Sequence, residues 1–213
     1  MTGLLIPVTA LLASVAILLV GHGLQLTLIP LYAVELGWAP DLIGYTGSSY
    51  FLGFVVGCLT VPPLVSRVGH IRVFAVLIAL ATAALLFIGM VDQFWFWLLA
   101  RGLSGWAFAG IYMVIESWLN EKTAVEYRGR VLSVYIIITL AAICAGQLLI
   151  GFEVGYAQLF LLSAGLLVLG IVPVGLTSAS VPAAIPPVRF RLKRVIAASQ
   201  VAMVGAFFGG MVT

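Results

Sequence analysis

The placement of the basic residues limits what this chain can fold into more than any other feature. Nine of the ten Lys and Arg residues lie at the ends of long uncharged stretches, and alternating connections would place all nine on one side of a membrane. The connections on the other side carry acids, which are Glu35, Asp41, Asp92 and Glu153. Because basic loops remain in the cytoplasm, this bias predicts a membrane protein that crosses the bilayer several times with a fixed orientation.

The composition supports a chain surrounded by lipid. Of its 213 residues 63% are hydrophobic and 8% are charged, whereas soluble domains carry roughly 25% charged residues. The apolar stretches lack two-residue alternation and are twice as long as a barrel strand, so we expect only helices to span the bilayer. The predicted fold class is therefore all-α, a polytopic membrane helical bundle. The net charge of +3 follows from the loop bias, so we expect lipid, and not nucleic acid, as a partner.

Six stretches contain the roughly 20 apolar residues that a spanning helix needs. We expect spans at about 4–32, 42–65, 73–91, 94–118, 131–152 and 157–176. With basic connections inside, six spans put both ends of this unit in the cytoplasm. We expect Trp38, Trp95 and Trp97 at the outer interface and Trp118 at the inner one.

The composition changes after the sixth stretch. We predict a six-helix transmembrane unit over 1–178, a cytoplasmic Pro- and Arg-rich linker over 179–194, and the start of a seventh span over 195–213. Three prolines break helix in the linker, and four basic residues follow them. A single seventh span with no connection after it suggests a fragment of a longer protein.

Small residues four apart allow helices to approach closely in lipid. Three predicted helices carry such pairs, which are Gly53 and Gly57, Gly105 and Ala109, and Ala141 and Ala145. We therefore expect close helix contacts at these positions.

Two ionisable residues lie within the fourth span. Arg101 and Glu116 are 15 residues apart, or roughly 22 Å along a helix, so they cannot pair with each other. At 100° per residue they share one face with Gly105, Phe108 and Tyr112, which we take as a cavity lining because buried charge favours a bundle interior. Arg101 either attracts an anion or controls a proton, or it is a structural arginine. Glu116 either couples protons or pairs with a cytoplasmic arginine.

The first span contains a mid-membrane histidine between two glycines. His22 and Gln25 stand three residues apart, so they share a face. They could bind a polar ligand or relay a proton, and the alternative is a neutral histidine that bonds a neighbouring helix. Further candidates for the cavity are Gln147 in the fifth span and Ser48, Ser49 and Tyr50 in the second, although each of these could instead make a packing hydrogen bond.

Enzyme classes find no support in the sequence. His22 and His70 are the only histidines and lie on different segments, so no metal cluster is expected. The sequence contains no phosphate-binding glycine loop followed by Lys-Ser or Lys-Thr, and no nucleophile and base stand out. We expect neither a cofactor nor an enzymatic activity.

Several short motifs together resemble the major facilitator superfamily. The connection Ser66-Arg67-Val68-Gly69-His70-Ile71-Arg72 is similar to that superfamily's Asp-Arg-x-Gly-Arg-Arg loop, and Arg101-x-x-x-Gly105 is similar to its fourth-helix signature. Ser48-Ser-Tyr, Glu116-Ser-Trp and Arg128-Gly-Arg resemble the YcaD-like branch of bacterial transporters. Ser66 stands where the acid is usual, and the Gly-Pro signature of drug–proton antiporters is absent from the fifth span.

The resemblance implies one half of a secondary transporter that works by alternating access in a bacterial inner membrane. The family has two six-helix halves around a midplane site, each built from inverted three-helix repeats, although no repeat is visible in this sequence. It implies a C-terminal half as partner, and a small solute as cargo, with a proton as candidate co-substrate. It also implies a solute path along His22, Gln25, Arg101, Tyr112, Glu116 and Gln147, and a cytoplasmic gating loop of Arg67, Gly69 and Arg72 with Arg128 and Arg130. The alternative is a non-transporting scaffold or receptor-like protein of the same fold.

Overall fold

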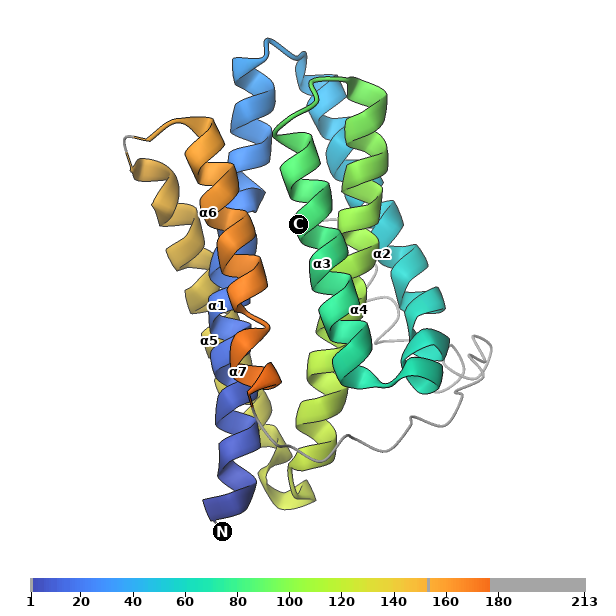
Figure 1. The fold of residues 1–213 in the computed structure, drawn as a ribbon, viewed down its shortest axis with the longest axis vertical. Helices are drawn as coiled ribbons and strands as arrows, with labels where there is room; N and C mark the ends of the chain where they lie inside the picture. The colour runs from blue at the N-terminus through green and yellow to red at the C-terminus, as the bar shows by residue number, and fades with distance from the viewer. Residues whose placement is uncertain (1, 153, 177–213) are drawn as a thin grey trace, which may run out of the picture.

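The structure, a computed structural model, describes residues 2–152 and 154–176, and the side chains from residue 8 onward. The predictions for Glu153, for the linker at 179–194 and for the seventh span at 195–213 lie outside the described residues. Within them, six long helices are joined by short connections (Figure 1). The elements are α1 (Thr2–Glu35), α2 (Pro40–Val68), α3 (His70–Ile88), α4 (Phe94–Lys122), η1 (Val125–Tyr127), α5 (Arg128–Leu148), η2 (Leu149–Gly151), α6 (Tyr156–Leu169) and α7 (Val172–Gly175).

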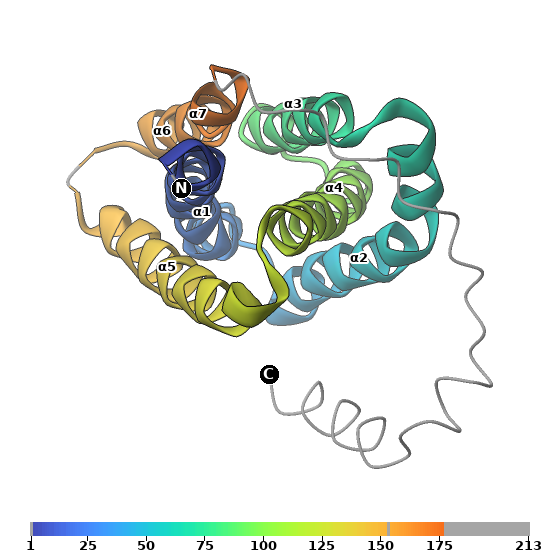
Figure 2. The ribbon, with the colours of Figure 1, turned by 90° about the horizontal axis from the view of Figure 1, so that it is seen from below.

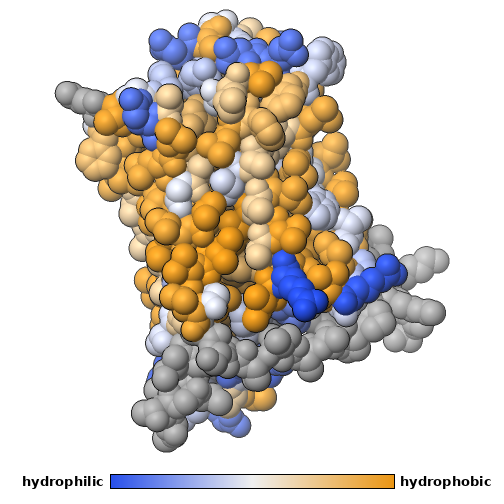
Figure 3. Space-filling view, viewed as in Figure 1, coloured by the Kyte–Doolittle hydropathy of each residue, from blue (hydrophilic) through white to orange (hydrophobic). Residues whose placement is uncertain are grey.

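The described helices confirm the expected spans. Six segments are long and apolar enough to cross a membrane, and they lie within a few residues of the predicted bounds. The chain runs up and down, so that connections on opposite sides alternate (Figure 1). In Figure 3 the middle of the molecule is largely hydrophobic, and hydrophilic residues gather toward its two ends. The surface therefore has the apolar belt that a bilayer requires.

Two glycines terminate helices by adopting a positive φ. Gly37 has φ +74 after α1, and its amide donates to the Val34 carbonyl at 2.9 Å. Gly69 has φ +94 and separates α2 from α3, and its amide donates to the Val65 carbonyl at 2.9 Å. Side chains rarely adopt this backbone conformation, so glycine is required for both tight reversals.

The helices pair in a crossed arrangement. α1 packs mainly against α5 and α6, whereas α4 packs mainly against α2 and α3 (Figure 2). The first helix of each three-helix unit thus packs against the last two helices of the other unit. The bundle therefore has an internal two-fold repeat that the sequence does not reveal.

Matching close contacts support this repeat. On α2 and α4, a Cβ on Gly105 would overlap the Tyr50 carbonyl, and one on Gly53 would overlap the Gly102 carbonyl. These contact positions are three residues apart on each helix.

The same spacing recurs between α1 and α5. A Cβ on Gly23 would overlap the Ile143 carbonyl, and one on Gly146 would overlap the Val20 carbonyl. Gly23 and Val20 on α1 thus correspond to Gly105 and Gly102 on α4. Both halves of the bundle use small residues to bring backbones together.

The expected small-residue contacts are confirmed for α2 and α4 but are wrong for α5. Ala141 and Ala145 are exposed, whereas Ala142 and Gly146, one position further along, are buried. Small residues are frequent in this helix, so the four-residue spacing alone could not show which face meets α1.

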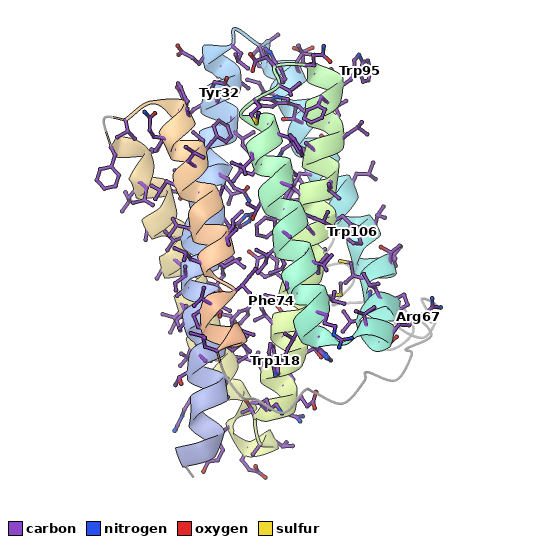
Figure 4. The ribbon with its side chains drawn as sticks, viewed as in Figure 1. Tyr32, Arg67, Phe74, Trp95, Trp106 and Trp118 are labelled. Carbon is purple, nitrogen blue, oxygen red and sulfur yellow. The ribbon has the colours of Figure 1, made fainter. Side chains whose placement is uncertain are left out.

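The tryptophan prediction is also only partly right. Trp95 is 75% exposed near the upper end of the bundle, as an interfacial residue would be (Figure 4). Trp97 and Trp118 are buried, and the Trp97 indole donates to the Val91 carbonyl at 2.7 Å. These two rings stabilise the ends of the bundle from inside and do not contact lipid head groups.

Candidate functional site

His22 and Gln25 form a hydrogen-bonded pair in the interior of the bundle. Gln25 Nε2 lies 2.6 Å from His22 Nδ1, and both side chains are buried on α1. Because an amide nitrogen only donates, the ring accepts at Nδ1 and carries its proton on Nε2. In this arrangement the pair directs the ring Nε2 and the amide oxygen away from their shared hydrogen bond.

The glycines around His22 let neighbouring helices approach α1. A Cβ at Gly21 would lie 2.9 Å from the Ser163 carbonyl on α6, and Gly23 meets the Ile143 backbone on α5. The Ser163 hydroxyl donates to the Gly21 carbonyl at 2.8 Å. Two sides of α1 are thus occupied by helices, and His22 is directed toward α4.

Aromatic rings from α2 and α4 surround His22. The His22 ring centroid lies 3.9 Å from that of Phe108, and 6.4 Å from those of Tyr50 and Tyr112. Phe54 on α2 lies 6.4 Å from Tyr112, also between centroids. These rings form a cluster at mid-depth, because Phe108 lies near the middle of α4.

Arg101 enters this cluster from α4. Its guanidinium carbon lies 4.5 Å from the centroid of the Tyr50 ring, which is a cation–π distance. Only 7% of the residue is exposed. Among the residues that the structure describes, its Nε and Nη1 atoms have no hydrogen-bond partner. A buried cation with unused donors is a costly arrangement in a protein interior.

Glu116 and Gln147 lie apart from the cluster of His22, Gln25, Tyr50, Arg101, Phe108 and Tyr112. Glu116 is exposed near the C-terminal end of α4, and its carboxylate interacts with the Tyr135 hydroxyl on α5. Gln147 is exposed on α5, next to the buried Gly146. The predicted path residues therefore form one central cluster of four, with two members at its margins.

Sequence reasoning found part of the site. Tyr50 was a cavity candidate beside Ser48 and Ser49, whereas nothing marked Phe54. The 100° rule placed Phe108 on the right face of its helix but could not show that it stacks on His22. Contacts between different helices carry no local signal in the sequence, so the stacking of these rings could not be predicted from it.

The connection between α2 and α3 is the second predicted site. Arg67 and Arg72 are exposed, and Figure 4 shows Arg67 at the lower end of α2. The contact across helix ends is made by His70, which is fully buried. Its Nε2 lies 3.2 Å from the Ser117 hydroxyl on α4. This contact leaves no sign in the sequence, because Ser117 lies 47 residues further along the chain.

The connection between α4 and α5 carries the remaining predicted gating residues. Arg128 Nε donates to the Thr123 carbonyl at 3.3 Å, which ties the arginine to its own connection. Arg130 is exposed. In the part of the chain that the structure describes, no group of three or more metal-ligating side chains occurs.

Comparison with known families decides the identity of the fold. The sequence model of the Major Facilitator Superfamily matches residues 11–213, which is nearly the whole chain. The chain belongs to the major facilitator superfamily. As members of that superfamily are transporters and not enzymes, the sequence-based exclusion of an enzyme is confirmed.

Within the superfamily, the chain is similar to YcaD. It is 30% identical over 169 residues to the uncharacterized MFS-type transporter YcaD of Salmonella arizonae, and equally to that of Salmonella typhimurium. The match covers 78% of this chain and 44% of each relative. The chain therefore spans less than half the length of the relatives it matches, and the resemblance to the YcaD-like branch is confirmed.

A solved structure supports the same fold. The bacterial homolog of the human lysosomal transporter Spinster, in an inward-facing and unoccupied conformation, superposes with a TM-score of 0.67 at 14% identity. The similarity covers 91% of this chain and 49% of that one. At this identity it establishes the major facilitator fold and carries nothing about the solute.

Proposed function

We propose that this chain forms the N-terminal half of a secondary active transporter that moves a small solute by alternating access. Family membership supports transport, and the 44% coverage of the relatives supports a half-protein. The observation that carries the proposal is the polar cluster of His22, Gln25 and Arg101, which is buried at mid-depth among aromatic rings. Side chains this costly to bury in a membrane protein usually serve a solute or ion path.

The proposal includes an organisation and a location for the chain. Residues 1–178 are the six-helix half, 179–194 a cytoplasmic linker and 195–213 the start of the seventh span. The basic connections, with Arg67 and Arg130 among them, face the cytoplasm, so both ends of the half lie there. The membrane is the bacterial plasma membrane, and the main protein partner is the C-terminal half.

The proposed path runs from the cluster toward the cytoplasmic end of α4. His22, Gln25, Arg101 and Tyr112 line its central part, and Glu116 and Gln147 lie at its margins. Glu116 is the carboxylate we assign to proton coupling, because it is an acid within a span and interacts with Tyr112, one member of the cluster. The α2–α3 connection, with Arg67, Gly69 and Arg72, gates the cytoplasmic side together with Arg128 and Arg130.

Transport in liposomes tests this function. Solutes that raise the unfolding temperature of the full-length protein would be selected from a library and offered to proteoliposomes with and without a pH gradient. Uptake of a selected solute is expected, and Glu116→Gln should remove its dependence on the gradient. The 213-residue chain alone should be inactive, because it lacks the opposing wall of the path.

Two results would contradict the proposal. Robust uptake by the 213-residue chain, with crosslinking showing a single copy, would refute the need for a second half. If Arg101→Gln and Glu116→Gln leave transport unchanged while lowering stability, these residues serve packing alone. That result would favour the scaffold or receptor-like alternative.

A further inference from the structure

We propose that the central cluster binds an organic anion, a carboxylate with a flat apolar body, and that Arg101 holds the carboxylate. This inference rests on the proposed transport function and adds the chemical class of its solute. Its basis is the buried guanidinium of Arg101, whose Nε and Nη1 atoms have no hydrogen-bond partner among the described residues.

No acid of the described chain lies where it could neutralise Arg101. Glu35 and Asp41 lie at the ends of α1 and α2, and Asp92 lies in the connection before α4. Asp92 precedes Arg101 by nine residues and accepts from the Tyr32 hydroxyl at 3.3 Å. Glu116 lies 15 residues further along α4, roughly 22 Å away. Among the described residues the cation contacts the Tyr50 ring, and its Nε and Nη1 atoms have no hydrogen-bond partner, so they can donate to an incoming anion.

The aromatic rings near Arg101 favour a particular shape for the apolar part of the ligand. His22 and Phe108 lie 3.9 Å apart between ring centroids, and Tyr50, Phe54 and Tyr112 complete an aromatic lining. Flat rings prefer offset or edge-on contact with other flat groups. An aromatic or similarly flat apolar body therefore fits this lining better than a branched or heavily hydroxylated one.

The His22–Gln25 pair adds a neutral polar point to the site. Because the two side chains hydrogen-bond each other, the ring Nε2–H and the amide oxygen are held in fixed positions. They can orient one further polar group of the ligand without adding charge. The site thus combines one cation, one neutral polar pair and an aromatic wall, which is the lining typical of a small-molecule pocket.

A matched set of three probes tests the inference. The complete protein in lipid nanodiscs would be titrated with phenylacetate, phenylacetamide and phenethylamine, which share a ring but differ in charge. Phenylacetate is expected to bind, and the neutral amide and the cation to bind roughly 10- to 100-fold more weakly, because they lose a charge-assisted hydrogen bond. Isothermal titration and thermal shift would report affinity independently of transport.

Two arginine variants separate charge from packing. Arg101→Gln should bring the affinity for phenylacetate down to that for phenylacetamide, while the amide binds as it does to wild type. Arg101→Lys keeps the charge and should retain part of the preference. If Arg101→Gln does not fold, the comparison of phenylacetate with phenylacetamide on the wild type still decides the question.

The inference is overturned if phenylacetamide or phenethylamine binds as well as phenylacetate, if Arg101→Gln retains the preference for the anion, or if none of the three probes binds. Transport of a neutral or cationic solute that does not depend on Arg101 would leave the proposed function intact and refute the anion site. Binding of phenylacetate through Arg101 in a protein that transports nothing would support the site and refute the function.

Discussion

Gly53 on α2 lies so close to Gly102 on α4 that a single added methyl group at Gly53 would overlap the Gly102 carbonyl. We therefore expect Gly53→Ala to push the two helices apart and to destabilise the protein by about 1–3 kcal/mol, as overpacking does. Thermal unfolding in detergent, followed by tryptophan fluorescence, would measure the loss. Gly47→Ala is the control on the same helix, because a Cβ there meets nothing within 4 Å. Equal unfolding temperatures for the two variants would show that the α2–α4 contact is looser than described.

The reversal between α2 and α3 depends on the backbone of Gly69, which has φ +94 and ψ 156. Alanine in this region of the backbone map is strained by about 1–3 kcal/mol, even though the space around Gly69 is open. We expect Gly69→Ala to lower the unfolding temperature and to make the connection more sensitive to protease. Gly129→Ala, at the helical start of α5 and also in open space, is the matched control and should have little effect. A normal unfolding temperature for Gly69→Ala would mean that the loop adopts another conformation.

His70 at the start of α3 and Ser117 near the end of α4 join these helices, with 3.2 Å between Nε2 and Oγ. A double-mutant cycle of His70→Ala and Ser117→Ala should give a coupling energy of about 0.5–1.5 kcal/mol, the range of a single hydrogen bond. Unfolding by SDS titration in mixed micelles would measure it. Ser133→Ala provides the control, because that hydroxyl donates to Gly129 on its own helix and should not couple to His70. Zero coupling between His70 and Ser117 would show that the two side chains do not interact in lipid.

Arg101 is expected to be retained for function and not for stability. Removing its charge in Arg101→Gln relieves the burial of an unpaired cation, and this gain offsets the loss of about 0.5–2 kcal/mol of cation–π attraction to Tyr50. We therefore expect an unfolding temperature equal to that of wild type or higher, together with loss of transport by the full-length protein. A large drop in stability would instead identify Arg101 as a structural residue.

The orientation can be checked by labelling introduced thiols. The free cysteines Cys58 and Cys144 are both exposed, so they would first be replaced by alanine. A membrane-impermeant maleimide should then label Asp92→Cys in intact cells and Arg67→Cys only after permeabilisation. Labelling of both residues from the same side of sealed cells would contradict the proposed topology.

The sequence was sufficient for features that depend on local composition. Each span could be found because lipid demands about 20 apolar residues in a row. Gly69 was found through the resemblance of its connection to the loop of the superfamily. The shared face of His22 and Gln25 follows from helix geometry alone. These predictions needed only neighbours along the chain.

Features that depend on which helices meet could not be predicted. Trp97 was expected at the lipid interface, but Tyr32 and Trp38 cover it from α1 and the connection that follows α1. Gln147 was assigned to the path from its polarity, but the register of α5 against Val20 turns Gly146 inward in its place. The internal repeat is likewise visible only in backbone contacts, where Tyr50 takes the position in one three-helix unit that Ile143 takes in the other. Because these two residues are so different, a comparison of the two sequence segments does not reveal the repeat.

The crossed pairing of the helices also sets the order in which they can pack during synthesis. When α1, α2 and α3 have entered the bilayer, Gly23 still lacks its neighbour, because Ile143 has not yet been made. The main packing partner of α2 and α3 is α4, so these two helices can pack as soon as α4 has been inserted, before α5 and α6 are made. The first helix to be inserted is therefore among the last to be locked in place, and the bundle closes only when the ribosome has delivered α5 and α6.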